Sequence, residues 1–88
     1  MADNQKKSMW VKITFVIDDY FIIAYLAKET DRMIFINKEF VEVEEMQNQE
    51  FGLLGKIEDV NKFYNKDHIF SIEILDNPPV EGFVKYDD

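Results

Sequence analysis

The apolar pattern between residues 9 and 28 constrains the fold of this chain more than any other feature. In residues 9–17 apolar side chains recur at every second position, which is the period of a β-strand with one buried face. Residues 20–28 are apolar on both faces, as in a strand at the centre of a sheet. Between them stand Asp18 and Asp19, a residue type that tolerates the backbone angles of a tight turn. The pattern therefore predicts an antiparallel hairpin.

The rest of the chain predicts further strands and a loop. We expect a short strand at 33–37. Residues 38–46 favour a strand, although their glutamates also tolerate a helix. Residues 47–55 predict a loop whose apolar side chains anchor it in the core: Phe51, Leu53 and Leu54. Strands are expected again at 68–75 and 80–86, separated by a stop at two prolines.

One segment predicts a helix. In residues 56–65, apolar side chains stand at helical spacing: Ile57, Val60, Phe63 and Tyr64. The expected fold class is therefore α+β, an antiparallel sheet of about five strands with one short helix packed on one face. A single short helix cannot cover a whole sheet, so we expect a homodimer to cover the second face. The alternative is that the C-terminal segment folds back over that face.

The length and composition predict one soluble domain. The chain has 88 residues, 47% of them hydrophobic, and no cysteine, so it needs a core without disulfides or thiolate metal sites. Residues 1–8 are polar and are expected to form a disordered leader, followed by a single acidic domain at 9–88. The apolar run 20–27 is shorter than the roughly 20 residues of a membrane span. The N-terminus also lacks an apolar signal core, which predicts a cytoplasmic protein that does not bind membranes.

The chain is strongly acidic, and its charge is unevenly placed. The formal net charge is −8, made up of +1 over residues 1–38, −4 over 39–66 and −5 over 67–88. Binding to phosphates needs lysine and arginine that displace counterions. Direct binding to nucleic acid is therefore not expected, and a basic protein is the more natural partner.

Glutamates in the segment 38–46 form the most suggestive motif. On a strand, Glu42 and Glu44 share a face with a spacing of about 6.7 Å. Two successive rises along one DNA strand cover about 6.8 Å. The alternative interpretation is a solvated acidic face that confers solubility. The candidate partner-binding residues are Glu39, Glu42, Glu44, Glu45, Glu50, Glu58, Asp59, Asp67, Glu73 and Asp76.

Catalytic and metal-binding signals are weak. His68 is the only histidine, and on a strand Ser71 would point to the opposite face, so no triad is expected. Gly52 and Gly55 have the spacing of a nucleic-acid-clamping loop, but two leucines lie between them, which predicts a turn with an apolar plug. No carboxylate spacing matches a helix–loop–helix calcium site. We therefore expect neither an enzyme, nor a cofactor, nor a specific metal site.

In size, acidity and lack of cysteine, the whole chain resembles small phage-encoded DNA-mimic proteins that disable host factors. Among these it most resembles phage inhibitors of the bacterial histone-like protein HU. The resemblance implies an acidic homodimer, acting in the host cytoplasm, that lodges in the DNA-binding cleft of its target and blocks that protein's binding to DNA. A generic interaction module, such as an adaptor, an antitoxin or an immunity protein, is the alternative.

Overall fold

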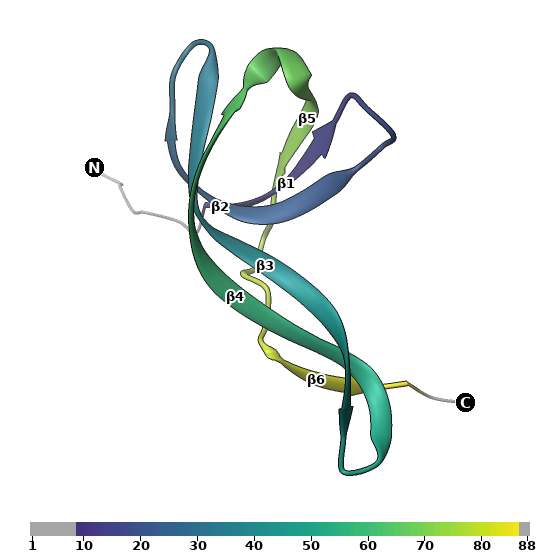
Figure 1. Ribbon diagram of the computed structural model, residues 1–88. Coiled ribbons are helices and arrows are strands. Elements are labelled where there is room, and N and C mark those ends of the chain that lie inside the picture. The colour runs from purple at the N-terminus through teal and green to yellow at the C-terminus, as the bar shows by residue number, and fades with distance from the viewer. Residues whose placement is uncertain (1–8, 87–88) are drawn as a thin grey trace.

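The computed structural model describes residues 9–86, which form a single antiparallel sheet of six strands (Figure 1). The leader expected at residues 1–8 lies outside the described residues. The strands are β1 (Trp10–Phe15), β2 (Phe21–Glu29), β3 (Met33–Gln47), β4 (Glu50–Asn65), β5 (Ile69–Ile74) and β6 (Gly82–Lys85).

The order of strands across the sheet is β5-β1-β2-β3-β4-β6. Strands β1 to β4 follow one another as hairpins. A single 3-10 turn, η1 (Lys66–His68), then carries the chain from β4 to β5, which pairs with the far side of β1. The turn is tied to the β1–β2 loop, because the Val16 amide donates to the His68 carbonyl at 3.0 Å. The sheet is consequently strongly curled at this end (Figure 1).

The predicted hairpin at residues 9–28 is confirmed. β1 and β2 are antiparallel, with Ile13 opposite Ile22. The turn between them contains Asp18 and Asp19, both with positive φ, at 61° and 51°. Short polar side chains of this kind occupy the left-handed region at low cost. The strand favoured for residues 38–46 is also confirmed, as part of β3.

The predicted helix at 56–65 is wrong, and with it the α+β fold class, because these residues form the second half of β4. The four apolar side chains do not make one stripe. Val60 and Tyr64 pack against the core, whereas Phe63 contacts Phe35 at a ring distance of 4.6 Å and Ile57 lies opposite Phe40. A strand with apolar residues on both faces can imitate helical spacing. Pairing with the long strand β3 outweighs the local preference of these residues for a helix.

The predicted loop at 47–55 is also wrong. A two-residue turn at Asn48 and Gln49, with φ of 49° and 68°, joins β3 directly to β4. Positive φ at both central residues is typical of hairpin turns that match the twist of the strands. The apolar residues of this segment do not enter the core, since Phe51 is 43% exposed and Leu53 and Leu54 are half-buried.

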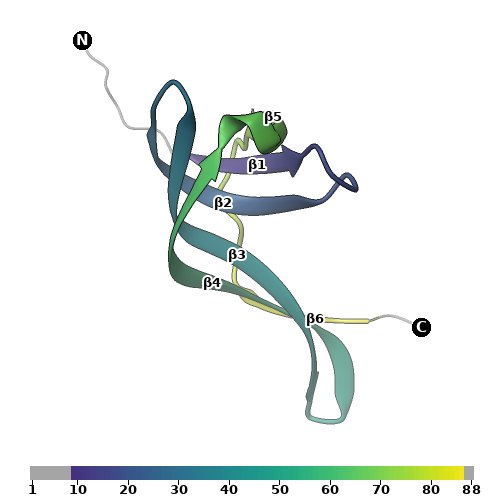
Figure 2. The ribbon, with the colours of Figure 1, turned by 45° about the horizontal axis from the view of Figure 1, so that its top comes forward.

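The core is small and lies in the curled part of the sheet. Its buried aliphatic side chains come from β1, β2 and the first half of β3: Val11, Ile13, Ile22, Ala24, Leu26, Ile34 and Ile36. The far half of the β3–β4 hairpin contributes none of them. We refer to residues 41–57 as the arm, and Figure 2 shows it projecting away from β1, β2 and β5.

Strand β6 supports the arm along the outer side of β4. It pairs from Gly52, opposite Lys85, to Gly55, opposite Gly82. Next to this ladder the Glu81 carboxylate accepts a hydrogen bond from the Ile57 amide at 2.7 Å. Within the arm, β6 and Glu81 thus cover most of the edge of β4 that faces away from β3.

Close approach of β6 to β4 depends on Gly52, and Gly52→Ala is expected to release β6. A Cβ at this position would lie 2.1 Å from the Val84 carbonyl oxygen, a backbone atom that cannot move without breaking the ladder. We expect faster hydrogen exchange of the amides in residues 83–86, measured by NMR. Gly55→Ala is the matched control, since its Cβ would meet only the Phe40 side chain, whose ring can shift. Unchanged exchange in Gly52→Ala would contradict this account of β6.

Candidate functional site

Three carboxylates on the arm are exposed and form no ion pair with the part of the chain that the structure describes. Glu42, Glu44 and Glu45 lie on β3, and within residues 9–86 no basic side chain forms an ion pair with any of them. Glu42 lies opposite Gly55 and Glu44 opposite Leu53, so both share one face. Glu45 points to the other face. The sequence prediction that Glu42 and Glu44 share a strand face is therefore confirmed.

The face that carries Glu42 and Glu44 also exposes an apolar strip. It is formed by Met46, Phe51 and Val84 on three neighbouring strands; Met46 and Val84 are each 66% exposed. Tyr86 joins the strip through its ring contact with Phe51 at 5.2 Å.

Tyr86 links the apolar strip to the acidic row, because its hydroxyl donates to a Glu44 carboxylate oxygen at 3.4 Å. Removal from water, together with this nearby carboxylate, raises the pKa of Tyr86.

Four of the candidate residues are neutralised by lysines. Glu39 is only 8% exposed and pairs with Lys62 at 3.0 Å, so it does not belong to the open acidic surface. The other ion pairs are Asp59 with Lys38 at 2.9 Å, Glu58 with Lys56 at 3.7 Å and Glu50 with Lys85 at 3.5 Å. Three of these pairs join residues on different strands, so charge runs in the sequence could not reveal them; only Glu58 and Lys56 are near neighbours on one strand, β4.

The remaining candidates lie away from the arm. Asp67 is in η1, Glu73 is on β5 opposite Lys12 of β1, and Asp76 follows β5. All three are exposed. The structure therefore does not gather the ten candidates into one surface. Six of the ten candidates form no ion pair among residues 9–86, and of these only Glu42, Glu44 and Glu45 lie together on the arm.

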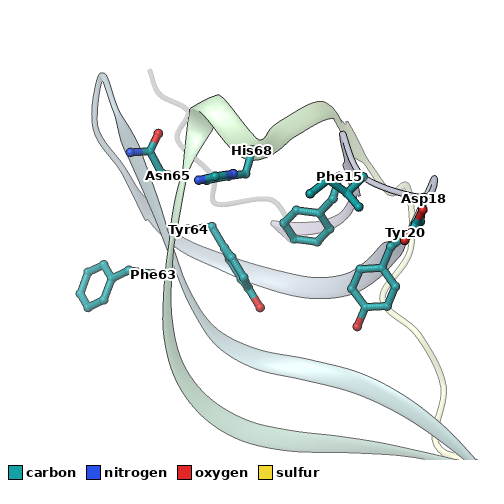
Figure 3. Close-up of a pocket in the computed structure, with 8 residues that line it drawn as sticks. Phe15, Asp18, Tyr20, Phe63, Tyr64, Asn65 and His68 are labelled. Carbon is teal, nitrogen blue, oxygen red and sulfur yellow. The ribbon is translucent and has the colours of Figure 1, made fainter.

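A cleft of about 600 Å³ opens at the other end of the molecule, between the β1–β2 turn and the end of β4 (Figure 3). Its wall is largely aromatic. Phe15 contacts Tyr20 at a ring distance of 5.7 Å and Tyr64 at 5.1 Å. His68 and Asp18 lie at its rim. Sequence reasoning missed this cleft, because its residues come from β1, the β1–β2 turn, β4 and η1, which meet only when the sheet curls.

The cleft does not hold the parts of a known catalytic arrangement. The His68 side chain is exposed in η1, while Ser71 lies on β5 opposite Thr14. Within residues 9–86 no group of three or more histidine or acidic side chains is close enough to hold a metal ion.

The expected turn between Gly52 and Gly55 is wrong, since both lie inside β4. No helix among the described residues is long and apolar enough to cross a membrane.

The pKa shifts of Lys62 and Tyr64 predict a fall in stability at alkaline pH. The hydrogen bond to Glu39 raises the pKa of Lys62 above its ordinary 10.5, and burial raises the pKa of Tyr64 above 10.0. Both groups hold their protons more tightly in the folded state than in the unfolded chain. Their contribution is complete below these ordinary values and is lost as the pH rises through the raised ones.

We therefore expect the melting temperature to fall as the pH is raised above about 10. Circular dichroism would follow the transition. Tyr64→Phe removes one of the two groups and should make this fall shallower. An equally steep fall in that variant would exclude Tyr64 as a cause.

Comparisons with known proteins give no family. A scan against protein-family models finds no match to this chain. Searches of curated proteins and of solved structures likewise find no significant match.

Proposed function

We propose that this protein is an inhibitor that mimics DNA and occupies the DNA-binding site of a basic bacterial protein, with the histone-like protein HU as the first candidate. The observation that carries the proposal is the projecting arm with unpaired Glu42, Glu44 and Glu45. A projecting element can enter a groove that a flat acidic surface could only cover. Carboxylates about 6.7 Å apart along a strand also carry the charge of phosphates and match two successive rises, about 6.8 Å, along one DNA strand.

The apolar strip beside the acidic row supports protein binding. Protein interfaces combine an apolar centre, enriched in aromatic residues and methionine, with a charged rim. Met46, Phe51 and Val84 provide such a centre next to Glu44. A face built only for solubility would not need exposed apolar groups of this size.

We also propose that the protein is a homodimer. The arm is one sheet layer thick, and it carries apolar side chains on both faces, with Val43 and Phe83 on the face opposite Met46 and Val84. A partner on one face leaves the other uncovered. Sedimentation equilibrium should give twice the chain mass of 10.5 kDa, and a chain-sized particle at every concentration would contradict the dimer.

A general interaction module is the second candidate, because the same apolar strip would serve an adaptor, an antitoxin or an immunity protein. The two functions differ in their dependence on salt. Binding steered by unpaired carboxylates weakens as salt screens the charges, whereas binding through apolar anchors changes little.

The first experiment is capture from a bacterial lysate. The immobilised protein is exposed to lysate at low salt, and bound proteins are eluted with duplex DNA. Recovery of HU or another basic DNA-binding protein in the duplex eluate is the expected result. Bound protein that resists both duplex and high salt would contradict DNA mimicry and favour the interaction module.

A further inference from the structure

Among residues 9–86, no strand lies beside one edge of the arm. The ladder between β2 and β3 ends at the pair Ile23 and Phe40, yet β3 continues to Gln47. Residues 41–47 therefore pair with β4 on one side only. In an antiparallel strand, alternate residues direct their N–H and C=O groups to opposite sides. Within residues 9–86, this leaves a row of backbone donors and acceptors on the open side of β3.

The opposite edge of the arm is formed by β4, and it is largely covered. Strand β6 covers β4 at residues 52–55, and Glu81 satisfies the Ile57 amide. The open edge is therefore confined to β3. It is also a long edge for a single strand, since natural proteins usually shorten, twist or cover such edges.

A groove marks the start of this edge. The first residues of β2, before Ile23, do not pair with β3, and the space between the two strands there, about 420 Å³, is lined by Phe21, Phe40 and Glu42 among others. The groove lies in line with the open edge, on the side from which a further strand would approach. It can receive a large side chain near one end of such a strand.

The charge of the edge selects what can pair with it. Glu42 and Glu44 present carboxylates on one face and Glu45 on the other. This charge disfavours pairing with the same edge of a second copy. If two copies paired about Glu44, for example, the Glu44 residues of both copies would lie directly opposite each other. Like charges directly opposite each other destabilise a ladder. Lysine or arginine side chains on an added strand would instead meet these carboxylates.

We infer that the partner contributes a basic extended segment that adds to the open edge of β3 as a strand, beside residues 41–47. Backbone hydrogen bonds would hold the segment in register, while Glu42, Glu44 and Glu45 select its positive charge. The inference rests on the proposed function for the claim that the partner is a basic protein. It adds how that protein is held, through its main chain as well as its charges.

The test compares two peptides of equal charge. The first is the acetylated and amidated peptide Lys-Thr-Lys-Thr-Lys-Thr-Lys, and the second is the same peptide methylated on every backbone nitrogen. Methylation removes the donors that a new strand needs but keeps the positive charges. We expect the methylated peptide to bind about tenfold more weakly, the loss that a few backbone hydrogen bonds would cause. Hydrogen exchange should show that the unmethylated peptide protects amides within residues 41–47.

A charge variant separates the contribution of the carboxylates from that of the backbone hydrogen bonds. Glu42→Gln with Glu44→Gln keeps the backbone and should weaken both peptides by a similar factor. Equal affinity of the two peptides for the native protein, with no new protection in residues 41–47, would overturn strand addition and leave DNA mimicry standing. Failure of both peptides to bind would also overturn it. The capture experiment tests DNA mimicry separately.

The exchange data also reveal other occupants of the edge. Protection of residues 41–47 without peptide, growing with protein concentration, would assign the edge to a second copy. The same protection at every concentration would mean that another part of the chain covers it. Either result would overturn the inference.

Discussion

Replacing both Glu42 and Glu44 by lysine is expected to weaken binding to HU about a hundredfold at low salt, a loss of roughly 2.7 kcal/mol. The double reversal turns two attractive positions into repulsive ones at the centre of the proposed interface. Both side chains are exposed and carry no ion pair among the described residues. The reversal removes the exposed 3.4 Å hydrogen bond from the Tyr86 hydroxyl to Glu44 but touches no core residue, so the variant should fold. Isothermal titration calorimetry would give the affinity, and an unchanged melting temperature would show that the variant is folded.

The matched control reverses the same number of charges elsewhere. Glu73→Lys with Asp76→Lys changes the net charge identically, but Glu73 lies on β5 and Asp76 two residues after it, and neither belongs to the arm. We expect a loss of only a fewfold from the altered overall field. Equal losses in the two double variants would show that net charge, and not the arm, determines binding.

Ile36→Ala is expected to destabilise the protein by about 2–5 kcal/mol, a large fraction of the roughly 5–15 kcal/mol typical of whole domains. Ile36 is fully buried among the few aliphatic side chains of the core. It also lies where the β2–β3 and β3–β4 ladders both shift register, so a cavity there affects pairing on both sides. Urea unfolding followed by circular dichroism would measure the loss.

Ile74→Ala tests whether burial is the cause. The substitution is the same, but Ile74 is 68% exposed. We expect a change within about 0.5 kcal/mol, as for most surface positions. A comparable loss at both positions would mean that the core does not lie where the structure places it.

Local patterns predicted the elements whose partners are near in sequence. The first hairpin follows from alternation in residues 9–17 and from the two aspartates of its turn, both of which act over a few residues. The strand at 38–46 follows from the same kind of signal. These signals do not depend on the rest of the fold, and the structure confirms them.

The second hairpin shows where local patterns fail. Asn48 and Gln49 form a turn that has no glycine to mark it, so the segment resembles a loop. Residues 56–65 have helical spacing, yet their backbone hydrogen bonds go to β3. Only the length of β3, which offers partners along the whole of β4, decides between helix and strand.

The acidic surface was predicted in part. The shared face of Glu42 and Glu44 follows from strand geometry alone. The neutralisation of Glu39 by Lys62 does not, because the two residues meet across a register shift between β3 and β4. The open edge of β3 was equally hidden, since it depends on where β2 begins and its ladder with β3 starts, at Ile23 and Phe40.

Competition between this protein and duplex DNA for HU tests the central claim most directly. A fluorescent duplex bound to HU is titrated with the native protein, and the anisotropy reports the bound fraction. DNA mimicry predicts complete displacement of the duplex, with a midpoint that rises in proportion to the duplex concentration, and about a hundredfold higher midpoint for the Glu42→Lys, Glu44→Lys variant. A complex that contains HU, duplex and this protein together would contradict the claim, because one site cannot hold both.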